Sequence, residues 1–343
     1  MNTVILEYIW LDGRGELRSK YKTVYVEDPF HFELEQWNYD GSSTYQASTG
    51  NSEIILNPVQ KYKNPFFEDS CIAYLVMCDT YRRENGVLVP TESNYRAAAK
   101  QIFDKTTEHM PWFGIEQEYF MMAPNSTFDS NKPLFFDRYQ HIEKQGQYYC
   151  GVGNQHIIYR QLAERHYLHC LYAGLSISGI NAEVAPNQWE YQIGPVLGIE
   201  AADQLWISRY ILHKLSEECN VNISFKPKPI SSPWNGSGLH TNFSTVGTRV
   251  HGGLEMMQEY INKLEKKHTE HIAVYGDNSE RLSGECETSD INTFTCGYGN
   301  RGCSIRIPTN ALDAKRGYFE DRRPASDADP YRVIGALVET CCL

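Results

Sequence analysis

The pattern of apolar residues changes near residue 90, and this change constrains the fold more than any other feature of the chain. Before it, short runs rich in Val, Ile and Tyr are separated by turn-forming residues, as in β-strands. Runs at 4–10 and 21–27 flank a turn at 12–15 and are predicted to pair as a hairpin, and further strands are predicted at 52–56 and 73–79. Residues 1–85 are therefore predicted to form a small, mostly β domain.

Beyond that point, apolar residues recur at helical spacing, beginning at Asn94. Helices are also predicted at 158–174, 200–219 and 254–274, with β-prone segments at 113–122, 180–194, 221–226, 238–245 and 303–307. Because helices and strands alternate without regular βαβ spacing, residues 86–343 are predicted to form an α+β domain with an antiparallel sheet rather than a Rossmann fold. The polar, aperiodic segment 123–147 is predicted to be a surface excursion.

Composition and charge exclude several classes of protein. The chain has 343 residues, of which 41% are hydrophobic, enough for a sizeable core and about two domains. Its net charge of −11 argues against nucleic acid or an anionic membrane as the main partner, and no run approaches the roughly 18 apolar residues of a membrane span. The ten cysteines form no C-x-x-C pair and residues 1–10 lack a secretory signal, so a cytoplasmic location is expected.

Two carboxylates share one strand-like segment. Glu116 and Glu118 are two residues apart, so in a strand their side chains point to the same face. Carboxylates that close repel each other unless a cation neutralises them or one takes a proton. An E-x-E pair is common on solvated strand edges, but the flanking Trp112, Phe113 and Tyr119 favour a partly buried strand, where unpaired acids are unfavourable.

Further candidate ligands lie in three other segments. Glu183 and Glu190 flank a Val-Ala-Pro-Asn turn, and a hairpin or bend there would bring them to one surface. His240 follows a run of small residues and Glu320 precedes two arginines; taken singly, these are typical of a hydrogen-bonded loop histidine and a salt-bridge cluster. Taken together with Glu116 and Glu118, oxygen-rich ligation with one imidazole suits Mg²⁺ or Mn²⁺ rather than structural zinc. Two such ions can bridge phosphate oxygens during phosphoryl transfer.

Arginines concentrate in the C-terminal third, at Arg281, Arg301, Arg306, Arg322 and Arg323. Guanidinium groups bind carboxylates and phosphates through paired hydrogen bonds. Metals and arginines together therefore suit a substrate that carries both groups. The chain has no P-loop and no kinase H-R-D motif, so ATP binding would need another scaffold.

These segments closely resemble the eukaryotic-type (type II) glutamine synthetases. The matching motifs follow in order along nearly the whole chain and include Trp37-Asn-Tyr-Asp-Gly-Ser-Ser-Thr44, Pro111-Trp-Phe-Gly-Ile-Glu-Gln-Glu-Tyr119, Gln188-Trp-Glu-Tyr-Gln-Ile-Gly-Pro195, His240-Thr-Asn-Phe-Ser-Thr245 and Gly317-Tyr-Phe-Glu-Asp-Arg-Arg-Pro324. The match is weakest over 123–147. The resemblance implies an N-terminal β-grasp-like domain, residues 1–85, and a large catalytic domain, residues 86–343, of the glutamine synthetase/guanido kinase-like fold with a curved antiparallel sheet.

The resemblance also implies roles for individual residues. Glu118, Glu183 and Glu190 resemble the ligands of a first metal ion, which helps to position glutamate, and Glu116, His240 and Glu320 those of a second, which coordinates ATP phosphates. The remaining implied roles are glutamate or phosphoryl binding for Arg281, Arg301, Arg323 and Gly236, nucleotide binding for Trp112, Ser244, Arg249, Arg301 and Arg306, ammonium binding for Asp40 and Ser43, and a flap that shields the intermediate for Glu287.

The implied reaction has two steps. The side-chain carboxylate of glutamate attacks the γ-phosphate of ATP, the co-substrate, and gives γ-glutamyl phosphate. Ammonium bound near Asp40 and Glu287 then loses a proton, and the resulting ammonia displaces phosphate to give glutamine. Two or three Mg²⁺ or Mn²⁺ ions per active site are implied. The family assembles into homo-oligomeric rings with active sites between neighbouring subunits, and eukaryotic-type members usually form a decamer of two five-membered rings.

The chain departs from the family pattern at several places. Before the flap glutamate, members usually have an aromatic or basic residue and then His, whereas this chain has Glu285-Cys286. The usual Gly-Val-Ala-Asn-Arg segment is Gly297-Tyr-Gly-Asn-Arg301 here, and the single Arg281 stands where many members have two arginines. After Thr245, Val246-Gly-Thr-Arg249 replaces the usual Lys-x-Met-Arg. The chain also begins at its first predicted strand, without the leading helix of most members. The flap changes bear on turnover and ammonia affinity, and the start of the chain bears on subunit stacking.

Two alternatives to glutamine synthesis stay open at this point. A γ-glutamyl-amine ligase would also activate glutamate, but it would change the ammonium pocket, whereas Asp40, Ser43 and Glu287 are intact. A non-catalytic homologue acting as a structural or regulatory oligomer would have no reason to keep mutually repelling carboxylates, although the altered flap keeps this reading open. Glutamine synthesis is the favoured prediction.

Overall fold

The computed structural model describes residues 1–67, 71–124, 133, 147–153, 156–230, 234–286 and 288–343. Contacts divide the chain into two compact units, Met1–Gln101 with His169–Leu175, and Ile102–Leu168 with Ser176–Leu343. The domain boundary predicted after residue 85 stays a prediction. Most of the surface excursion predicted at 123–147 lies outside the described residues.

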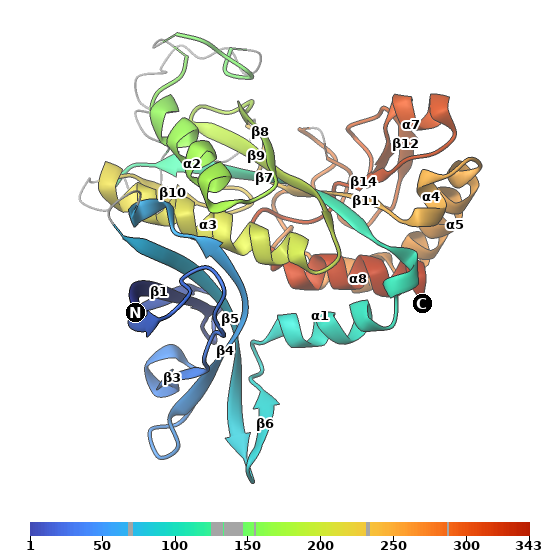
Figure 1. The fold of residues 1–343 in the computed structure, drawn as a ribbon. Coiled ribbons are helices and arrows are strands. Elements are labelled where there is room, and N and C mark those ends of the chain that lie inside the picture. The colour runs from blue at the N-terminus through green and yellow to red at the C-terminus, as the bar shows by residue number, and fades with distance from the viewer. Residues whose placement is uncertain (68–70, 125–132, 134–146, 154–155, 231–233, 287) are drawn as a thin grey trace. The chain divides into compact units, whose positions relative to one another are not determined.

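The first unit contains a six-stranded sheet (Figure 1). Its strands are β1 (Asn2–Leu11), β2 (Leu17–Val26), β3 (Trp37–Asp40), β4 (Glu53–Lys63), β5 (Ile72–Glu84) and β6 (Val87–Pro90). They lie in the order β2-β1-β5-β4-β3, with β6 paired to β5; β1 and β5 run parallel and the other pairs antiparallel. The predicted hairpin and the two other predicted strands are confirmed, whereas β3 and β6 have no counterpart among the predictions.

A buried carboxylate holds the turn of the β1–β2 hairpin. The side chain of Asp12 is fully buried, and its Oδ1 accepts hydrogen bonds from the backbone N–H groups of Arg14 and Glu16 at 2.8 and 3.0 Å. Its Oδ2 forms an ion pair of 2.7 Å with Arg18. Gly15 has φ +80°, a conformation that glycine adopts without strain. The local sequence Asp-Gly-Arg-Gly therefore explains why the chain reverses here.

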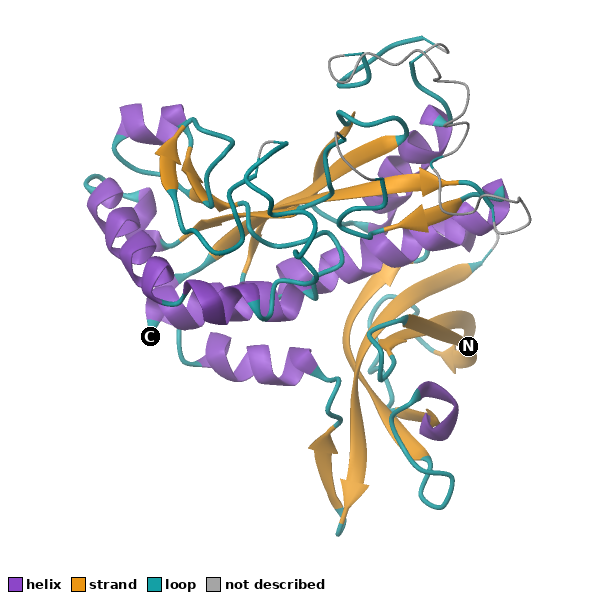
Figure 2. Ribbon diagram, turned by 180° about the vertical axis from the view of Figure 1, so that it is seen from behind, coloured by secondary structure: helices purple, strands orange, loops and turns teal. Residues whose placement is uncertain are grey.

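The second unit contains an eight-stranded sheet that carries the candidate site (Figures 1 and 2). Its strands are β7 (Trp112–Met122), β8 (Ile177–Ala182), β9 (Gln188–Leu197), β10 (Asn222–Ser224), β11 (Leu239–Ser244), β12 (Cys296–Tyr298), β13 (Ile305–Ile307) and β14 (Phe319–Asp321). The order is β12-β13-β14-β11-β7-β9-β8, with β10 paired to β7, and only the β12–β13 pair among these named strands is parallel. The predicted α+β class with an antiparallel sheet is confirmed.

The strand predicted at 180–194 is divided by the predicted turn. β8 ends at Ala182 and β9 begins at Gln188, and the two strands pair antiparallel with Ala182 opposite Trp189. The residues between them form the hairpin connection. The turn-forming Pro-Asn pair thus separates two strands, and Asn187 has the positive φ of 54° that asparagine tolerates better than most residues.

The helices are α1 (Tyr95–Asp104), α2 (Arg160–Ala173), α3 (Glu200–Cys219), α4 (Val246–Arg249), α5 (Gly253–Lys266), α6 (His268–Ile272), α7 (Thr309–Ala314) and α8 (Pro330–Cys342). The predictions of α1, α2 and α3 are confirmed. The single helix predicted at 254–274 is wrong, because the helix is interrupted at Lys267, whose backbone (φ −104°, ψ 13°) leaves the helical region. None of the described helices is long and apolar enough to cross a membrane.

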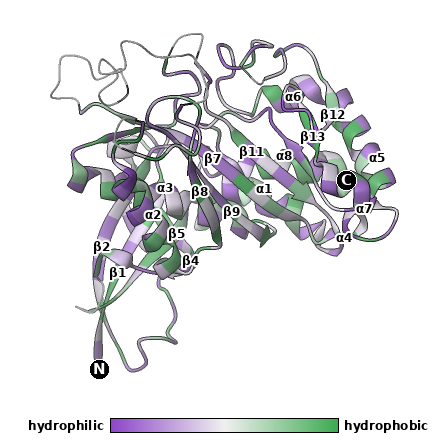
Figure 3. Cartoon of the chain, turned by 90° about the horizontal axis from the view of Figure 1, so that it is seen from above, coloured by the Kyte–Doolittle hydropathy of each residue, from purple (hydrophilic) through white to green (hydrophobic). Residues whose placement is uncertain are grey.

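Helices α3 and α8 pack against each other, and α3 contacts β7, β9 and β10 of the second sheet (Figure 2). Hydrophilic and hydrophobic segments are mixed along β7 and β11 (Figure 3). On β7, Phe113, Ile115, Gln117 and Tyr119 are almost fully buried, while Glu116 is partly exposed. The strand alternation therefore leaves the two glutamates of β7 on the face opposite Phe113, Ile115 and Tyr119.

Candidate functional site

Four neighbouring strands bring acidic and imidazole side chains to one face of the sheet. In the register of β7 and β9, Glu118 is opposite Glu190, and in the register of β7 and β11, Glu116 is opposite His240. β14 adds Glu320, which pairs with Asn242 of β11. Directly opposed residues of antiparallel strands have adjacent side chains, so segments far apart in sequence meet here.

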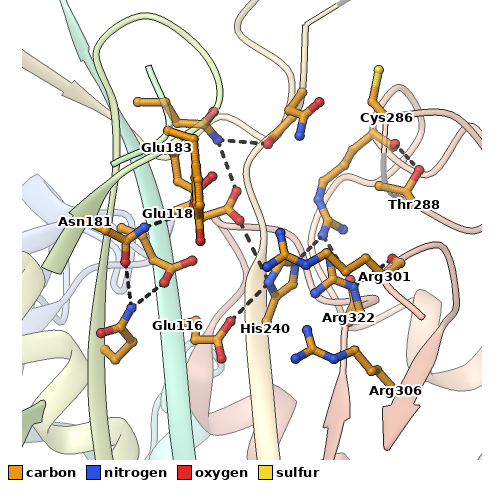
Figure 4. A pocket seen from close by; sticks show the side chains of 17 residues that line it. Glu116, Glu118, Asn181, Glu183, His240, Cys286, Thr288, Arg301, Arg306 and Arg322 are labelled. Carbon is orange, nitrogen blue, oxygen red and sulfur yellow. Dashed lines mark hydrogen bonds and ion pairs between the residues drawn. The ribbon is translucent and has the colours of Figure 1, made fainter. Parts of the chain in front are cut away.

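Glu116, Glu118, Glu190 and His240 line a cavity of about 260 Å³ (Figure 4). The cavity is polar, with carboxylates and amides on one side and guanidinium groups on the other. Its lining residues are Glu116, Glu118, Tyr149, Asn181, Glu183, Gln188, Glu190, Gln192, Asn235, Gly236, His240, Arg281, Cys286, Thr288, Arg301, Arg306 and Arg322.

His240 lies at the centre of the acidic side. Its Nδ1 is 3.4 Å from Glu116 Oε2, 3.7 Å from Glu320 Oε1 and 3.8 Å from Glu118 Oε1. Two sets of three side chains have ligand atoms within 4.8 Å of one another: Glu116, His240 and Glu320, and Glu118, Glu190 and His240. The first set has the same members as the second metal site that the resemblance implies.

The second set differs from the implied metal site in one member. The resemblance implies Glu183 beside Glu118 and Glu190, whereas the geometric set has His240. Glu183 lines the same cavity, and its carboxylate accepts hydrogen bonds from Asn181 Nδ2 at 3.0 Å and from the backbone N–H of Val184 at 3.1 Å. The two donors to the Glu183 carboxylate thus come from residues only one and two positions away in the chain.

Burial and mutual repulsion shift the protonation of this cluster. Burial, with the neighbouring Glu183 charge, raises the pKa of Glu118 to about 8. The pKa of Glu190 is raised well above its ordinary value, mainly by burial and then by Glu116. Burial, followed by the Arg322 charge, lowers the pKa of His240 well below its ordinary value. A divalent cation would lower the raised pKa values of the carboxylates and would lower the pKa of His240 further, because it favours ionised carboxylates and a neutral imidazole.

The donor set fits a hard divalent cation. Carboxylate oxygens with a single imidazole nitrogen are the ligands of Mg²⁺ and Mn²⁺ rather than of structural zinc. The site is also built for close approach: a Cβ atom on Gly238 would lie 2.5 Å from Nη2 of Arg281 and 2.6 Å from Nε2 of His240. A side chain at this position would displace Arg281 or His240, so glycine lets the chain pass directly beside the cluster.

Guanidinium groups form the opposite side of the cavity. Arg322 donates from Nη1 to Glu320 Oε1 at 2.6 Å and from Nε to the carbonyl oxygen of Arg301 at 3.0 Å. Arg306 pairs with Glu320 Oε2 at 3.1 Å. The buried Arg281 donates to the carbonyl oxygen of Arg322 at 2.9 Å, and burial lowers its pKa to about 10, so it stays charged at neutral pH. Positive and negative groups thus share one cavity.

Arg323 lies elsewhere than its predicted role requires. Its side chain, just beyond the end of β14, is fully buried and pairs with Asp321 at 2.7 Å, and it does not line the cavity. Arg322, one residue earlier, does line it. Side chains alternate between faces along an extended chain, and the same alternation that turns Glu320 and Arg322 towards His240 and the cavity arginines turns Asp321 and Arg323 away from them. Of the two adjacent arginines, Arg322 is therefore the one that faces the cavity.

The predicted residues Asp40 and Ser43 do not line this cavity. Both are in the first unit, Asp40 at the end of β3 and Ser43 in the turn that follows it. The Asp40 carboxylate accepts hydrogen bonds from the N–H and hydroxyl of Ser42 at 3.0 and 2.7 Å, and the hydroxyl bond is the main cause that lowers its pKa. Glu287 lies outside the described residues.

A second cavity of about 450 Å³ has mostly apolar walls and shares Glu116 and Gln192 with the first. The predicted residues Trp112, Ser244 and Arg249 line it. The guanidinium carbon of Arg249 lies 4.4 Å from the Trp112 ring centroid, and Nη1 of Arg249 donates to Ser244 Oγ at 3.0 Å. An aromatic ring and a cation beside an apolar cavity suit a flat heteroaromatic group.

The first, polar cavity also includes amide side chains that were not among the predicted site residues, among them Gln188 and Gln192. Gln192 donates to Glu190 and to Asn181 Oδ1, the latter at 3.1 Å. Both glutamines are two residues from Glu190, so the rule that residues i and i+2 share a strand face would have found them.

Comparison with known proteins gives a consistent result. The family model described as glutamine synthetase, catalytic domain, matches residues 93–342. The chain is 48% identical to the glutamine synthetase of Emericella nidulans over 99% of this chain and 93% of the relative. It is 48% identical to a putative glutamine synthetase of Acanthamoeba polyphaga mimivirus, over 98% and 94% of the two chains. For the glutamine synthetase of Schizosaccharomyces pombe the identity is 47%, over 98% and 91%.

Proposed function

The chain belongs to the glutamine synthetase family, and from this premise we propose that it joins ammonia to the side-chain carboxylate of glutamate while ATP is converted to ADP and phosphate. The observation that carries the proposal is the single cavity in which a carboxylate–imidazole cluster faces four arginines. Such a cavity suits substrates that bring a phosphate and a carboxylate together.

The proposed cofactors are Mg²⁺ or Mn²⁺ ions, two or three per site. The protein groups that would hold them are Glu116, His240 and Glu320 on one side, and Glu118 and Glu190, with Glu183, on the other. When bound, such ions neutralise the carboxylates and the negative charge on transferring phosphoryl oxygens.

We propose that the arginines orient the reacting groups in the first step. An oxygen of the glutamate side chain forms a bond to the γ-phosphorus of ATP, and the bond from that phosphorus to the β-phosphate oxygen breaks, which releases ADP. Arg301, Arg306 and Arg322 are proposed to hold the phosphoryl oxygens and Arg281 with Gly236 the substrate glutamate. Fixed guanidinium groups in a partly buried cavity stabilise the charge that spreads over the phosphoryl oxygens.

The adenine ring is proposed to occupy the apolar cavity beside Trp112, Ser244 and Arg249. The two cavities share Glu116, which supports a nucleotide lying across both, with its base in one and its phosphates in the other. Glu116 would then be close to the phosphates, which agrees with its proposed role as a ligand of the phosphate-binding ion.

In the second step, the nitrogen of ammonia forms a bond to the activated carbonyl carbon and phosphate leaves. Asp40 and Ser43 are proposed to bind ammonium, and Glu287 to take its proton and shield the intermediate. The lowered pKa of Asp40 keeps this carboxylate ionised at neutral pH, which suits a cationic ligand. We further propose a ring-forming homo-oligomer, of decameric size, in which the ammonium site is completed by a neighbouring subunit, and a cytoplasmic location.

The deciding experiment measures phosphate release with ATP, Mg²⁺, glutamate and ammonia, beside a Glu287→Ala control. The expected result is release that requires both glutamate and ammonia, with glutamine formed in equal amount. Release that needs glutamate but not ammonia would point to hydrolysis of the acyl phosphate or to another amine acceptor. An absence of release despite binding of ATP and Mn²⁺ would overturn the catalytic proposal.

A further inference from the structure

The side-chain amide of Gln188 has an orientation determined by the backbone. Gln188 is the first residue of β9 and is only 1% exposed. Its side-chain Oε1 accepts a hydrogen bond from the backbone N–H of Ala185 at 3.2 Å. The backbone N–H of Gln188 in turn donates to the carbonyl oxygen of Ala185 at 3.1 Å. Because a backbone N–H can only donate, the amide oxygen must face Ala185 and the amide nitrogen must point the other way.

The amide nitrogen of Gln188 faces oxygens of the candidate site. Nε2 lies 3.2 Å from Glu118 Oε2, 3.0 Å from the carbonyl oxygen of Gly236 and 3.2 Å from Ser237 Oγ. Glu118 Oε2 also accepts from the backbone N–H of Gly238 at 2.9 Å. Oε2 of Glu118 thus accepts hydrogen bonds from two donors, while Oε1 lies 3.8 Å from Nδ1 of His240.

From these contacts we infer that Gln188 is a positioning residue, which aims Oε1 of Glu118 at the cation and ties the segment 236–238 to the same carboxylate. The inference rests on the proposed function, because it describes how the proposed cation and glutamate sites are held together. Groups that bond to the second oxygen of a ligating carboxylate fix its rotation, and changing such outer groups weakens metal binding or activity about 10- to 100-fold.

An amide is the side chain that this position requires. A carboxylate at 188 would add a negative charge beside Glu118 and would replace the donating N–H groups by acceptors. An apolar side chain of the same length would leave Glu118 Oε2 and the Gly236 carbonyl without this donor, which is unfavourable in a buried place. Glutamine supplies the donors without charge, and Ala185 keeps them pointed at the site.

The consequence is a link between metal binding and glutamate binding. Gln188 holds both Glu118, a proposed metal ligand, and the Gly236 carbonyl, at the position proposed for glutamate. It does not line the apolar cavity proposed for the adenine ring. Loss of the amide is therefore expected to weaken Mn²⁺ and glutamate binding while ATP binding changes little.

The test uses Gln188→Met and Gln188→Glu in the full chain, with Gln204→Met as the matched control. Gln204 is a similarly buried glutamine on α3, where it accepts from the N–H of Ser176 at 2.7 Å and donates to Glu200 at 2.9 Å, and it does not line the cavity. Mn²⁺ binding is measured by titration calorimetry, melting temperature is measured in EDTA, and the KM values for glutamate and ATP are measured separately.

Both Gln188 variants are expected to weaken at least one class of Mn²⁺ sites about 10- to 100-fold and to raise the KM for glutamate, with the KM for ATP within twofold of the parent. Gln204→Met is expected to lower the melting temperature but to keep the Mn²⁺ affinities. Parent-like Mn²⁺ affinity in a folded Gln188 variant, or equal weakening in Gln204→Met, would overturn the inference and leave the proposed function standing. A parent that binds no Mn²⁺ would overturn both.

If neither variant folds, Gln188→Asn takes their place. It keeps the amide but is one methylene shorter, so its donors withdraw from Glu118. Weaker Mn²⁺ binding in this variant supports the inference, and unchanged binding contradicts it.

Discussion

At the scale of single residues, two adjacent arginines have different surroundings. Arg322 lines the cavity and donates to Glu320, whereas Arg323 is fully buried and pairs with Asp321. Arg323 also donates from Nη1 towards His268 Nδ1 at 3.1 Å and lies 5.3 Å from the Tyr275 ring centroid. Arg322 therefore faces the cavity, where we propose that it binds substrate, and Arg323 belongs to the core.

These surroundings predict different effects of substitution. Arg323→Met leaves the buried Asp321 carboxylate without its partner, which is expected to cost about 3–5 kcal/mol of unfolding free energy. Arg322→Lys keeps a charge but loses the fork that bonds Glu320 and the Arg301 carbonyl, so kcat/KM is expected to fall about 10²–10³-fold with the melting temperature nearly unchanged. Urea denaturation and steady-state kinetics check both. A stable Arg323→Met that had lost turnover would contradict the assignment.

The raised pKa of Glu118 predicts a pH-dependent stability. In the metal-free protein, the folded state favours the protonated Glu118 carboxyl, and this preference adds to the free energy of unfolding. The contribution is complete below the ordinary pKa of a glutamate and is lost as the pH rises toward about 8. The loss is at most about 1.4 kcal/mol per pH unit.

Glu118→Gln is expected to flatten this dependence and to raise the melting temperature of the metal-free protein at pH 8. Mn²⁺ should stabilise the parent by mass action and the variant much less. Thermal melts in EDTA and in Mn²⁺ between pH 5 and pH 8 measure both effects. A parent that becomes more stable than Glu118→Gln as pH rises in EDTA would contradict the prediction.

At the scale of elements, β7 is anchored from behind. Gln117, between the two glutamates, points to the other face, where its Oε1 accepts from Arg209 of α3 at 2.8 Å and its Nε2 donates to the carbonyl oxygen of Ser326 at 3.0 Å. Arg209 also donates to the carbonyl oxygen of Ala328 at 3.1 Å. The strand that carries the cluster is thus joined to α3 and to the segment that leads into α8.

The start of α8 supplies a prediction at this scale. Asp329 caps the helix by accepting from the N–H of Arg332 at 3.1 Å, and Pro330 occupies the first turn. Asp329→Ala removes this cap and is expected to lower the unfolding free energy by about 0.5–2 kcal/mol, whereas Asp329→Asn can still accept the hydrogen bond and should cost less. Chemical denaturation measures both variants. Equal losses in the two would mean that the charge, rather than the cap, matters.

At the scale of the whole molecule, the residues proposed to bind ammonium and those proposed to bind metal belong to different units. Asp40 belongs to the first unit and the carboxylate cluster to the second. If neighbouring subunits complete each other's sites in a ring, as proposed, the first unit of one chain works with the second unit of the next. Such a contact would be heterologous, and it gives a ring when the rotation between neighbours closes.

Mixing two inactive variants tests this arrangement. Asp40→Ala damages only the first unit and Glu190→Gln only the second, so after joint unfolding and reassembly some sites receive two intact units. Random assembly would restore roughly a quarter of the parental activity. Each variant reassembled alone is the control and should stay inactive. Mixed samples with no more activity than these controls would contradict shared sites.

The sequence by itself determined the features that depend on near neighbours. The hairpin at Asp12, the shared face of Glu116 and Glu118, and the turn between Glu183 and Glu190 all follow from local backbone preferences and the two-residue period of strands. The family followed from motifs that extend along the chain. The Asp329-Pro330 pair is likewise a local helix start signal, although no helix was predicted there.

Only the tertiary structure decided which of these groups meet. The registers of β7 with β9 and β11, and of β11 with β14, bring Glu190, His240 and Glu320 to the β7 glutamates, and such registers join segments that no local pattern relates. The same pairing separated Arg322 from Arg323 and put the Gln188 amide against Glu118. A strand period states which residues share a face, but packing of distant segments determines which face surrounds the cavity.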